Sequence, residues 1–195
     1  MNKGKATKEN ILKTAFNVAS QDGLESLTFG VLARHCGLSK SGLYAHFNSK
    51  ENLQVMVVEY ANLKFIERVL QPARDQFSND LESKIRLLLE NWLNWNHSFQ
   101  GSCMFLDAWR SDTDEDNTVQ QSLIKGNNKW IRYMEIQIEK AKHTGVFSVE
   151  LDTKQAVYQI YGVYLSSQLF YAIDGEDESR ERFWKSIDFL FQHWR

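Results

Sequence analysis

Residues that break helices are scarce in this sequence, and this scarcity constrains its fold more than any other feature. The 195 residues include one proline, Pro72, and ten glycines. Proline disrupts a helix interior and glycine is costly there, so long stretches of the chain are free to be helical. No alternating apolar run is bounded by the turn dipeptides that mark a hairpin. The sequence therefore predicts an all-α protein.

Apolar residues recur at helical spacing along the chain, and capping residues separate the segments. Gly23 and Gly37 suit helix ends, and Pro72 is expected to end or bend a long helix over residues 50–70. We predict helices that begin at the N-caps Thr7, Thr28, Ser39 and Ser49. Further helices over residues 81–99, 119–143, 153–172 and 178–194 complete a fold of about nine helices.

Charge is distributed unevenly between the start of the chain and the rest. Residues 1–50 contain seven lysines and arginines against three acidic residues, a net charge of +4. The whole chain has a net charge of −2, so residues 51–195 carry −6. A basic module joined to an acidic one is typical of a DNA-binding domain fused to a domain that does not bind DNA. We therefore expect domains over residues 1–50 and 51–195.

Residues 28–50 combine a short helix, a tight turn and a second short helix. The turn over residues 36–39 supplies Gly37 for the bend, Leu38 for packing and Ser39 to cap the next helix. This is the helix-turn-helix arrangement, whose second helix enters the major groove of DNA. Small and basic side chains in its first turn suit contact with phosphates and base edges. That turn consists of Ser39, Lys40, Ser41 and Gly42.

The stretch from Leu27 to Leu53 resembles the DNA-binding signature of the TetR family of bacterial transcription regulators. Its most specific part is Leu-Tyr-x-His-Phe-x-x-Lys-Glu-x-Leu, over residues 43–53. The resemblance extends over residues 8–55. It implies an N-terminal three-helix bundle with a helix-turn-helix, joined by the long helix to an all-helical body. It also implies that the body binds a small effector and forms a homodimer through its last two helices.

The resemblance implies roles for individual residues. Tyr44 and Lys50 match positions that contact phosphates, and Thr28 matches one that caps the second helix beside the DNA backbone. Residues 40–42 match base-facing positions, and His46 matches a position near the backbone. The predicted DNA-binding residues are Thr28, Ser39, Lys40, Ser41, Gly42, Tyr44, His46 and Lys50.

Two positions depart from the family's patterns. Gly30 stands where several relatives carry a long side chain that reads a base, which glycine cannot do. Residues 101–105, Gly-Ser-Cys-Met-Phe, resemble a Gly-Gly-Cys-hydrophobic segment found in one subfamily, but Ser102 replaces the second glycine. The operator sequence that this chain reads is therefore not indicated by the resemblance.

Aromatic residues are concentrated in the predicted body. They either line a cavity for an apolar or aromatic effector or form an aromatic core, and the sequence leaves both open. Our candidates for effector binding are Trp92, Phe105, Trp109 and Tyr161. The last helix is similarly ambiguous, because its apolar residues either form a dimer interface or cover the monomer's own core. Those residues are Phe183, Trp184, Ile187, Phe191 and Trp194.

Neither a catalytic nor a metal site emerges from the sequence. The histidines lack ligand spacing, and no nucleophile–base pair or phosphate-binding glycine loop is present. The acidic residues 112–116 lack the glycine and closing glutamate of a calcium loop, which favours a solvated loop. Cys103 has apolar neighbours, so a buried thiol is favoured over a redox sensor. We expect no cofactor and no enzymatic activity.

The expected environment of the protein is the cytoplasm. No apolar run approaches the roughly 18 residues of a membrane span, and the basic N-terminus is not followed by the apolar region of a signal peptide.

Taken with the helix-turn-helix and the resemblance, the sequence predicts a DNA-binding regulator whose partners are double-stranded DNA, a small effector and a second copy of the chain. The alternatives are an enzyme and a DNA-binding architectural or cell-division protein without a small ligand.

Overall fold

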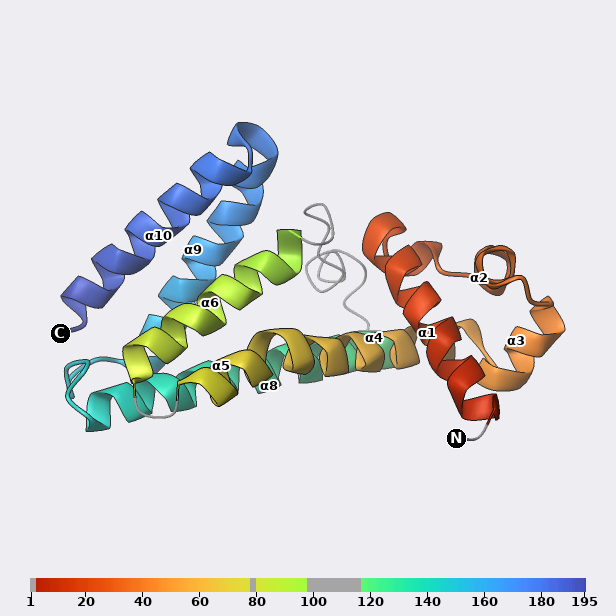
Figure 1. Cartoon of the computed structure of the whole chain (residues 1–195), viewed down its shortest axis with the longest axis horizontal. Coiled ribbons are helices and arrows are strands. Elements are labelled where there is room, and N and C mark those ends of the chain that lie inside the picture. Colours follow the sequence, from red (N-terminus) through yellow and green to blue (C-terminus); the bar gives the residue numbers. More distant parts are fainter. Residues whose placement is uncertain (1–2, 78–79, 98–116) are drawn as a thin grey trace. The chain divides into compact units, whose positions relative to one another are not determined.

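The computed structural model describes residues 3–77, 80–97 and 117–195. Within these ranges every regular element is a helix, which confirms the predicted all-α fold (Figure 1). None of these helices is both long and apolar enough to cross a membrane. Two compact units are present: one contains residues 3–67 and 117–128, and the other contains the described residues from 68 to 97 and from 129 to 195.

The first unit contains a helical bundle in which two short helices, α2 and α3, pack with two longer ones. Its elements are α1 (Lys3–Asp22), the 3-10 turn η1 (Leu24–Ser26), α2 (Phe29–Cys36), α3 (Lys40–Phe47) and α4 (Lys50–Phe65). Helix α1 packs against η1, α2 and α4, and α3 packs between α2 and α4. Leu32, Leu43, Phe47 and Leu53 are fully buried where these elements meet. Burying each such side chain stabilises the fold by about 1.5–3 kcal/mol.

The predicted caps of these helices are confirmed, with one exception. Thr28 accepts a hydrogen bond from the Val31 amide at 3.2 Å, and Ser49 accepts one from the Asn52 amide at 3.0 Å. Gly37 adopts the left-handed conformation at the end of α2, with a φ of 64°. The N-cap predicted at Thr7 is wrong, because α1 already begins at Lys3. Residues 3–6 contain no helix breaker stronger than one glycine, so the helix extends past the threonine.

The long helix changes type before Pro72 and does not end there. Helix α4 passes into a π-helical segment, η2 (Ile66–Leu70), and then into α5 (Gln71–Gln76). Pro72 lies in the first turn of α5, where a missing amide proton is tolerated. The π-helical segment ends two residues before the proline, and within it the Val69 carbonyl accepts from the Asn91 side-chain amide at 3.1 Å.

The second unit is built on α6 (Leu81–His97), the later part of α8 (Thr118–His143), α9 (Thr153–Asp174) and α10 (Glu176–His193). Helices α9 and α10 form an antiparallel pair joined at Gly175, whose φ of 90° favours glycine (Figure 1). Buried residues on this pair and on α6 form the core of the unit. They include Ile85, Leu89, Ile160, Phe183, Ile187 and Phe191.

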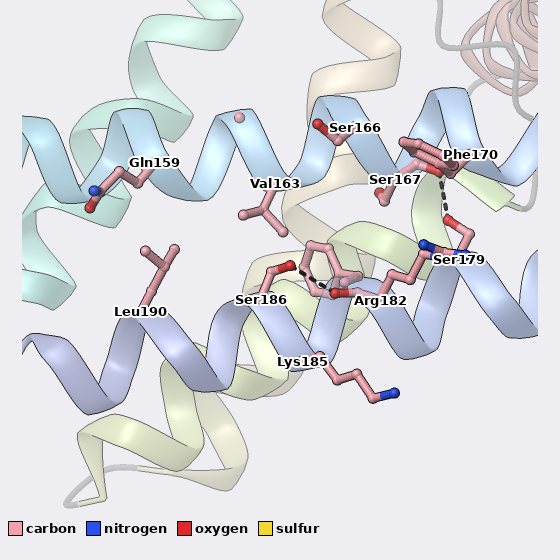
Figure 2. Close-up of a pocket in the computed structure, with 12 residues that line it drawn as sticks. Gln159, Val163, Ser166, Ser167, Phe170, Ser179, Arg182, Lys185, Ser186 and Leu190 are labelled. Atoms are coloured by element: carbon pink, nitrogen blue, oxygen red, sulfur yellow. Dashed lines mark hydrogen bonds between the residues drawn. The ribbon is translucent and has the colours of Figure 1, made fainter.

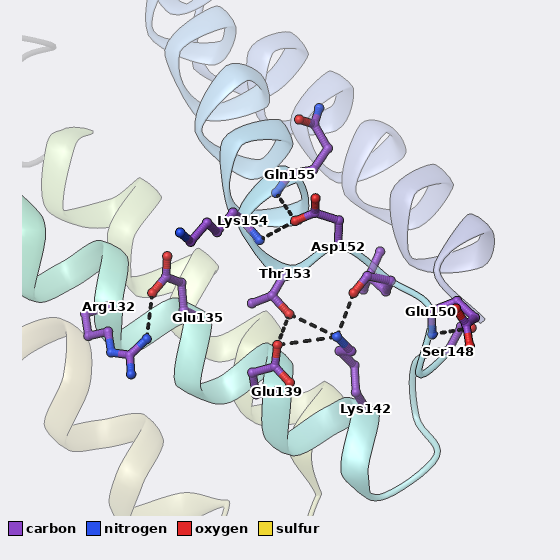
Figure 3. A network of polar contacts seen from close by, with 11 residues as sticks. Arg132, Glu135, Glu139, Lys142, Ser148, Glu150, Asp152, Thr153, Lys154 and Gln155 are labelled. Atoms are coloured by element: carbon purple, nitrogen blue, oxygen red, sulfur yellow. Dashed lines mark hydrogen bonds and ion pairs between the residues drawn. The ribbon is translucent and has the colours of Figure 1, made fainter.

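A polar network fastens the end of α8 to the start of α9 (Figure 3). Lys142 Nζ donates to the Leu151 carbonyl at 2.7 Å and lies 3.3 Å from Glu139 Oε1. The Thr153 hydroxyl also donates to Glu139. That hydrogen bond and the Lys142 ammonium lower the pKa of Glu139 below its ordinary value. Asp152 caps α9 by accepting from the Lys154 and Gln155 amides.

Candidate nucleic-acid interface

The first turn of α3 presents small polar groups on an exposed surface. Ser39 caps the helix by accepting from the Gly42 amide at 3.1 Å, and its Oγ lies 3.1 Å from Ser41 Oγ. Residues 39–42 are all exposed. The two serine hydroxyls thus contact each other and cap the helix, and Lys40 is the one large side chain of this turn. A helix start with small exposed side chains can approach base edges closely.

The later residues of α3 divide into exposed and buried groups. The Tyr44 side chain is 58% exposed, and its ring meets the edge of the Phe29 ring at a centroid distance of 5.9 Å. His46 is half-buried beside Phe47, which lies fully in the core. Tyr44 is therefore held by α2 while its hydroxyl remains free to reach a phosphate.

Two side chains of α4 hold η1 by its backbone. Lys50 Nζ lies 3.1 Å from the Glu25 carbonyl and 3.3 Å from the Glu25 carboxylate. One turn later, the buried Gln54 amide donates to the Leu24 carbonyl at 2.9 Å. Sequence reasoning identified Lys50 only as a phosphate contact and missed Gln54. Its partner is a backbone atom thirty residues away, which no local pattern indicates.

The predicted effector residues in the described part of the chain belong to one aromatic cluster in the second unit. Trp92 is 5% exposed and stacks on Tyr164, with ring centroids 3.6 Å apart. Tyr161 and Trp130 meet the Trp92 ring edge-on at 4.9 and 5.2 Å. Neither Trp130 nor Tyr164 is among the residues predicted to contact an effector. Phe105 and Trp109 lie outside the described residues, as does the whole of segment 101–105.

A buried amide lies on the same helix as Trp130. Gln137 is 2% exposed, and its Nε2 donates to the Tyr133 carbonyl at 3.4 Å. Its side-chain oxygen has no hydrogen-bond partner within the described residues. An unsatisfied buried acceptor is costly, so this oxygen is suited to accept from a bound polar group.

The outer face of the α9–α10 pair carries exposed apolar residues and a groove of about 610 Å³ (Figure 2). The groove floor contains small residues, namely Gly162, Ser166 and Ser186. Four of the apolar residues predicted from the last helix, Phe183, Ile187, Phe191 and Trp194, are buried in the monomer's own core, although Phe183 also borders the groove. The exposed large apolar residues of the pair are Tyr158, Leu165, Leu169, Phe170, Ile173 and Phe189.

Two family descriptions match this chain. Residues 11–55 match the bacterial regulatory proteins of the tetR family. Residues 82–187 match the tetracyclin repressor-like C-terminal domain. The first range contains the helix-turn-helix, and the second begins in α6 and ends in α10.

Curated relatives include transcription regulators and a nucleoid occlusion factor. The HTH-type transcriptional regulator SrpR of Pseudomonas putida is 20% identical over 90% of this chain and 79% of its own length. The uncharacterized HTH-type transcriptional regulator YerO of Bacillus subtilis (strain 168) is 40% identical, but over only 27% of this chain and 18% of YerO. The nucleoid occlusion factor SlmA of Photorhabdus laumondii is 27% identical over 68% of this chain and 64% of SlmA.

Solved structures share the fold over nearly the whole chain. A TetR-family transcriptional regulator from Cytophaga hutchinsonii has a TM-score of 0.83 at 18% identity and covers 100% of this chain and 98% of its own. AibR, in complex with isovaleryl coenzyme A and operator DNA, has a TM-score of 0.69 at 19% identity, with coverages of 95% and 98%. With both family descriptions matched, the chain belongs to the TetR family and is a helix-turn-helix, DNA-binding transcription regulator.

Proposed function

We propose that this protein is a homodimeric repressor that binds a pseudo-palindromic operator and is released by a small apolar or aromatic effector. The observation that carries the proposal is the exposed, serine-capped first turn of α3. Residues 1–50 form the DNA-binding domain, and residues 51–195 bind the effector and dimerise. Lys40, Ser41 and Gly42 face bases, while Tyr44, Lys50, Thr28 and His46 position the protein on the DNA backbone.

Dimerisation through α9 and α10 explains the apolar residues exposed on that face. Leu169 and Ile173 are 60% and 64% exposed, which is unusual for large apolar side chains on neighbouring helical turns. A second copy would cover them and fill the groove at Gly162 and Ser166, where small residues permit close helix approach. The two recognition helices of the dimer would then lie about 34–36 Å apart, one turn of DNA.

The aromatic cluster around Trp92 is the proposed effector wall. Tryptophan and tyrosine supply apolar faces for such a ligand. The unsatisfied oxygen of Gln137, on the same helix as Trp130, is a candidate acceptor for a polar group. AibR carries both isovaleryl coenzyme A and operator DNA on a similar fold. The effector need only favour a state whose recognition helices no longer match the operator spacing.

The helix that starts at Lys50 is the proposed lever between effector and DNA. It begins in the unit that holds α3 and continues through η2 into the unit that holds the aromatic cluster. Asn91, which binds the carbonyl of Val69 in η2, is the chain neighbour of Trp92. A shift of α6 around an effector would therefore be transmitted to η2 through the Asn91–Val69 hydrogen bond.

The similarity to SlmA favours one alternative, a DNA-binding cell-division protein without a small effector. A screen of apolar and aromatic compounds for release of bound DNA separates the two, because only the repressor has a ligand that lowers its DNA affinity.

The primary experiment selects duplexes from a randomised pool with the full-length protein and measures the mass of the resulting complex. The proposal predicts enrichment of a two-fold symmetric sequence bound by two subunits. Enrichment of an asymmetric sequence, or one subunit per duplex, would contradict it.

A further inference from the structure

Gly30 in the first turn of α2 lies against the side chain of Lys40, the first residue of α3. A Cβ atom added to Gly30 would lie 3.4 Å from Cε of Lys40 and 3.6 Å from its Nζ. The Lys40 side chain therefore extends from the start of α3 back across α2. It fills the space that a longer side chain at position 30 would enter.

The ammonium of Lys40 is consequently presented from α2, although the residue belongs to α3. The same added Cβ would lie 3.8 Å from Thr28 Oγ1, so the ammonium and the Thr28 hydroxyl flank one point on the surface. The neighbouring Ser39 and Ser41 hydroxyls contact each other instead.

This surface is an open groove of about 600 Å³ with uncompensated positive charge. Arg34 and Lys40 both line the groove and are exposed, and neither forms an ion pair with any carboxylate that the structure describes. Lys50, by contrast, is paired with Glu25. Two cations without acidic partners in one groove favour a polyanion such as DNA.

We infer that Gly30 and Lys40 act together as one specificity element, an inference that rests on the operator recognition proposed above. Because position 30 has no side chain, Lys40 reaches over α2 and donates to a base edge from there. A lysine ammonium suits the O6 and N7 acceptors of guanine in the major groove. Gly30 is a positioning residue that acts through Lys40.

The test measures binding of variants to a selected duplex and to its single-base-pair substitutions. Lys40→Ala should lose about tenfold of discrimination at one base pair in each half-site and keep it elsewhere. Gly30→Leu, which occupies the space of the Lys40 side chain, should lose the preference at that same base pair. The double variant should lose no more discrimination at that base pair than either single variant does. Gly30→Ala is the matched control and should keep the preference, because its methyl group makes ordinary contact at 3.4 Å.

Three results would overturn the inference while leaving operator recognition intact. One is an equal loss across all duplexes for Lys40→Ala, which would make Lys40 a phosphate contact. The second is a loss of preference in Gly30→Leu at a different base pair. The third is a Gly30→Leu change that costs the Lys40→Ala protein as much discrimination as it costs the wild type. A wild-type protein that enriches no sequence would overturn both proposals. Circular dichroism melts of every variant distinguish a loss of base recognition from a loss of folding.

Discussion

Lys50 Nζ is shared between the backbone carbonyl of Glu25, at 3.1 Å, and the carboxylate of the same residue, at 3.3 Å. The lysine thus holds η1 against α4 while its side chain stays 43% exposed. A DNA phosphate would compete with the Glu25 carboxylate for the same ammonium. The residue therefore serves the fold and the proposed interface together.

Replacing Lys50 with alanine should weaken binding to every duplex and reduce the slope of log affinity against log salt by about one, because one phosphate contact is lost. Glu25→Gln should do the opposite and raise affinity for all duplexes, since it removes the competing carboxylate. Anisotropy titrations at several salt concentrations measure both effects. A salt slope unchanged by Lys50→Ala would remove Lys50 from the interface.

Tyr44→Phe removes only the hydroxyl of an exposed ring. We expect a loss of about 1.5–3 kcal/mol in operator affinity, the range for a hydrogen bond to a charged group such as a phosphate. The melting temperature should not change, because the ring contact with Phe29 is retained. Wild-type affinity for Tyr44→Phe would show that the hydroxyl contacts no phosphate.

The Gln54 side chain should matter for stability in spite of its polar character. Gln54→Ala leaves the Leu24 carbonyl without its partner, so the free energy of unfolding should fall by about 1–3 kcal/mol in urea titrations. Gln192→Ala, on the exposed surface of α10, is the matched control and should have little effect. Equal losses of stability in the two variants would contradict the role of the Gln54 side chain in holding η1 against α4.

Glu139 should make stability depend on pH in the acid range. Its pKa is lowered in the fold by the Thr153 hydroxyl and by Lys142, so the folded state favours the carboxylate. The stabilisation is present above the ordinary pKa of 4.5 and is lost as pH falls through the lower, folded-state pKa. Unfolding of wild type and Glu139→Gln should therefore differ at neutral pH and converge in acid. A difference that does not change with pH would refute this role.

Leu169→Asp should dissociate the proposed dimer without unfolding the subunit, because this side chain is 60% exposed in the monomer. Val149→Asp is the matched control: it is 71% exposed but lies in the connection between α8 and α9. Sedimentation velocity should give a monomer for the first variant and a dimer for the second. If Leu169→Asp still sediments as a dimer, this face is not the dimer interface.

The features that the sequence predicts well are local ones. Thr28, Ser39 and Ser49 accept hydrogen bonds from amides three residues away, so short sequence windows contain both partners. The features that it missed depend on tertiary contacts. The Gln54–Leu24 bond and the Trp92–Tyr164 stack join residues distant along the chain, and nothing in either local sequence identifies the partner.

The last helix shows why residue composition alone does not assign a surface. Its apolar residues were ambiguous between core and dimer interface, and most of the selected ones are core. The exposed apolar residues lie mainly on α9, whose helix is apolar on more than one face. Which face meets α6 and α10 is set by packing, which the periodicity of α9 does not reveal.

The most direct test of operator recognition is an anisotropy titration of the purified protein against the selected duplex and a scrambled duplex, at two salt concentrations. We expect tight binding of two subunits to the selected duplex, with a preference over the scrambled duplex that survives at the higher salt. Equal, weak binding to both duplexes that disappears with salt would mean that α3 makes only non-specific phosphate contacts, which would contradict operator recognition.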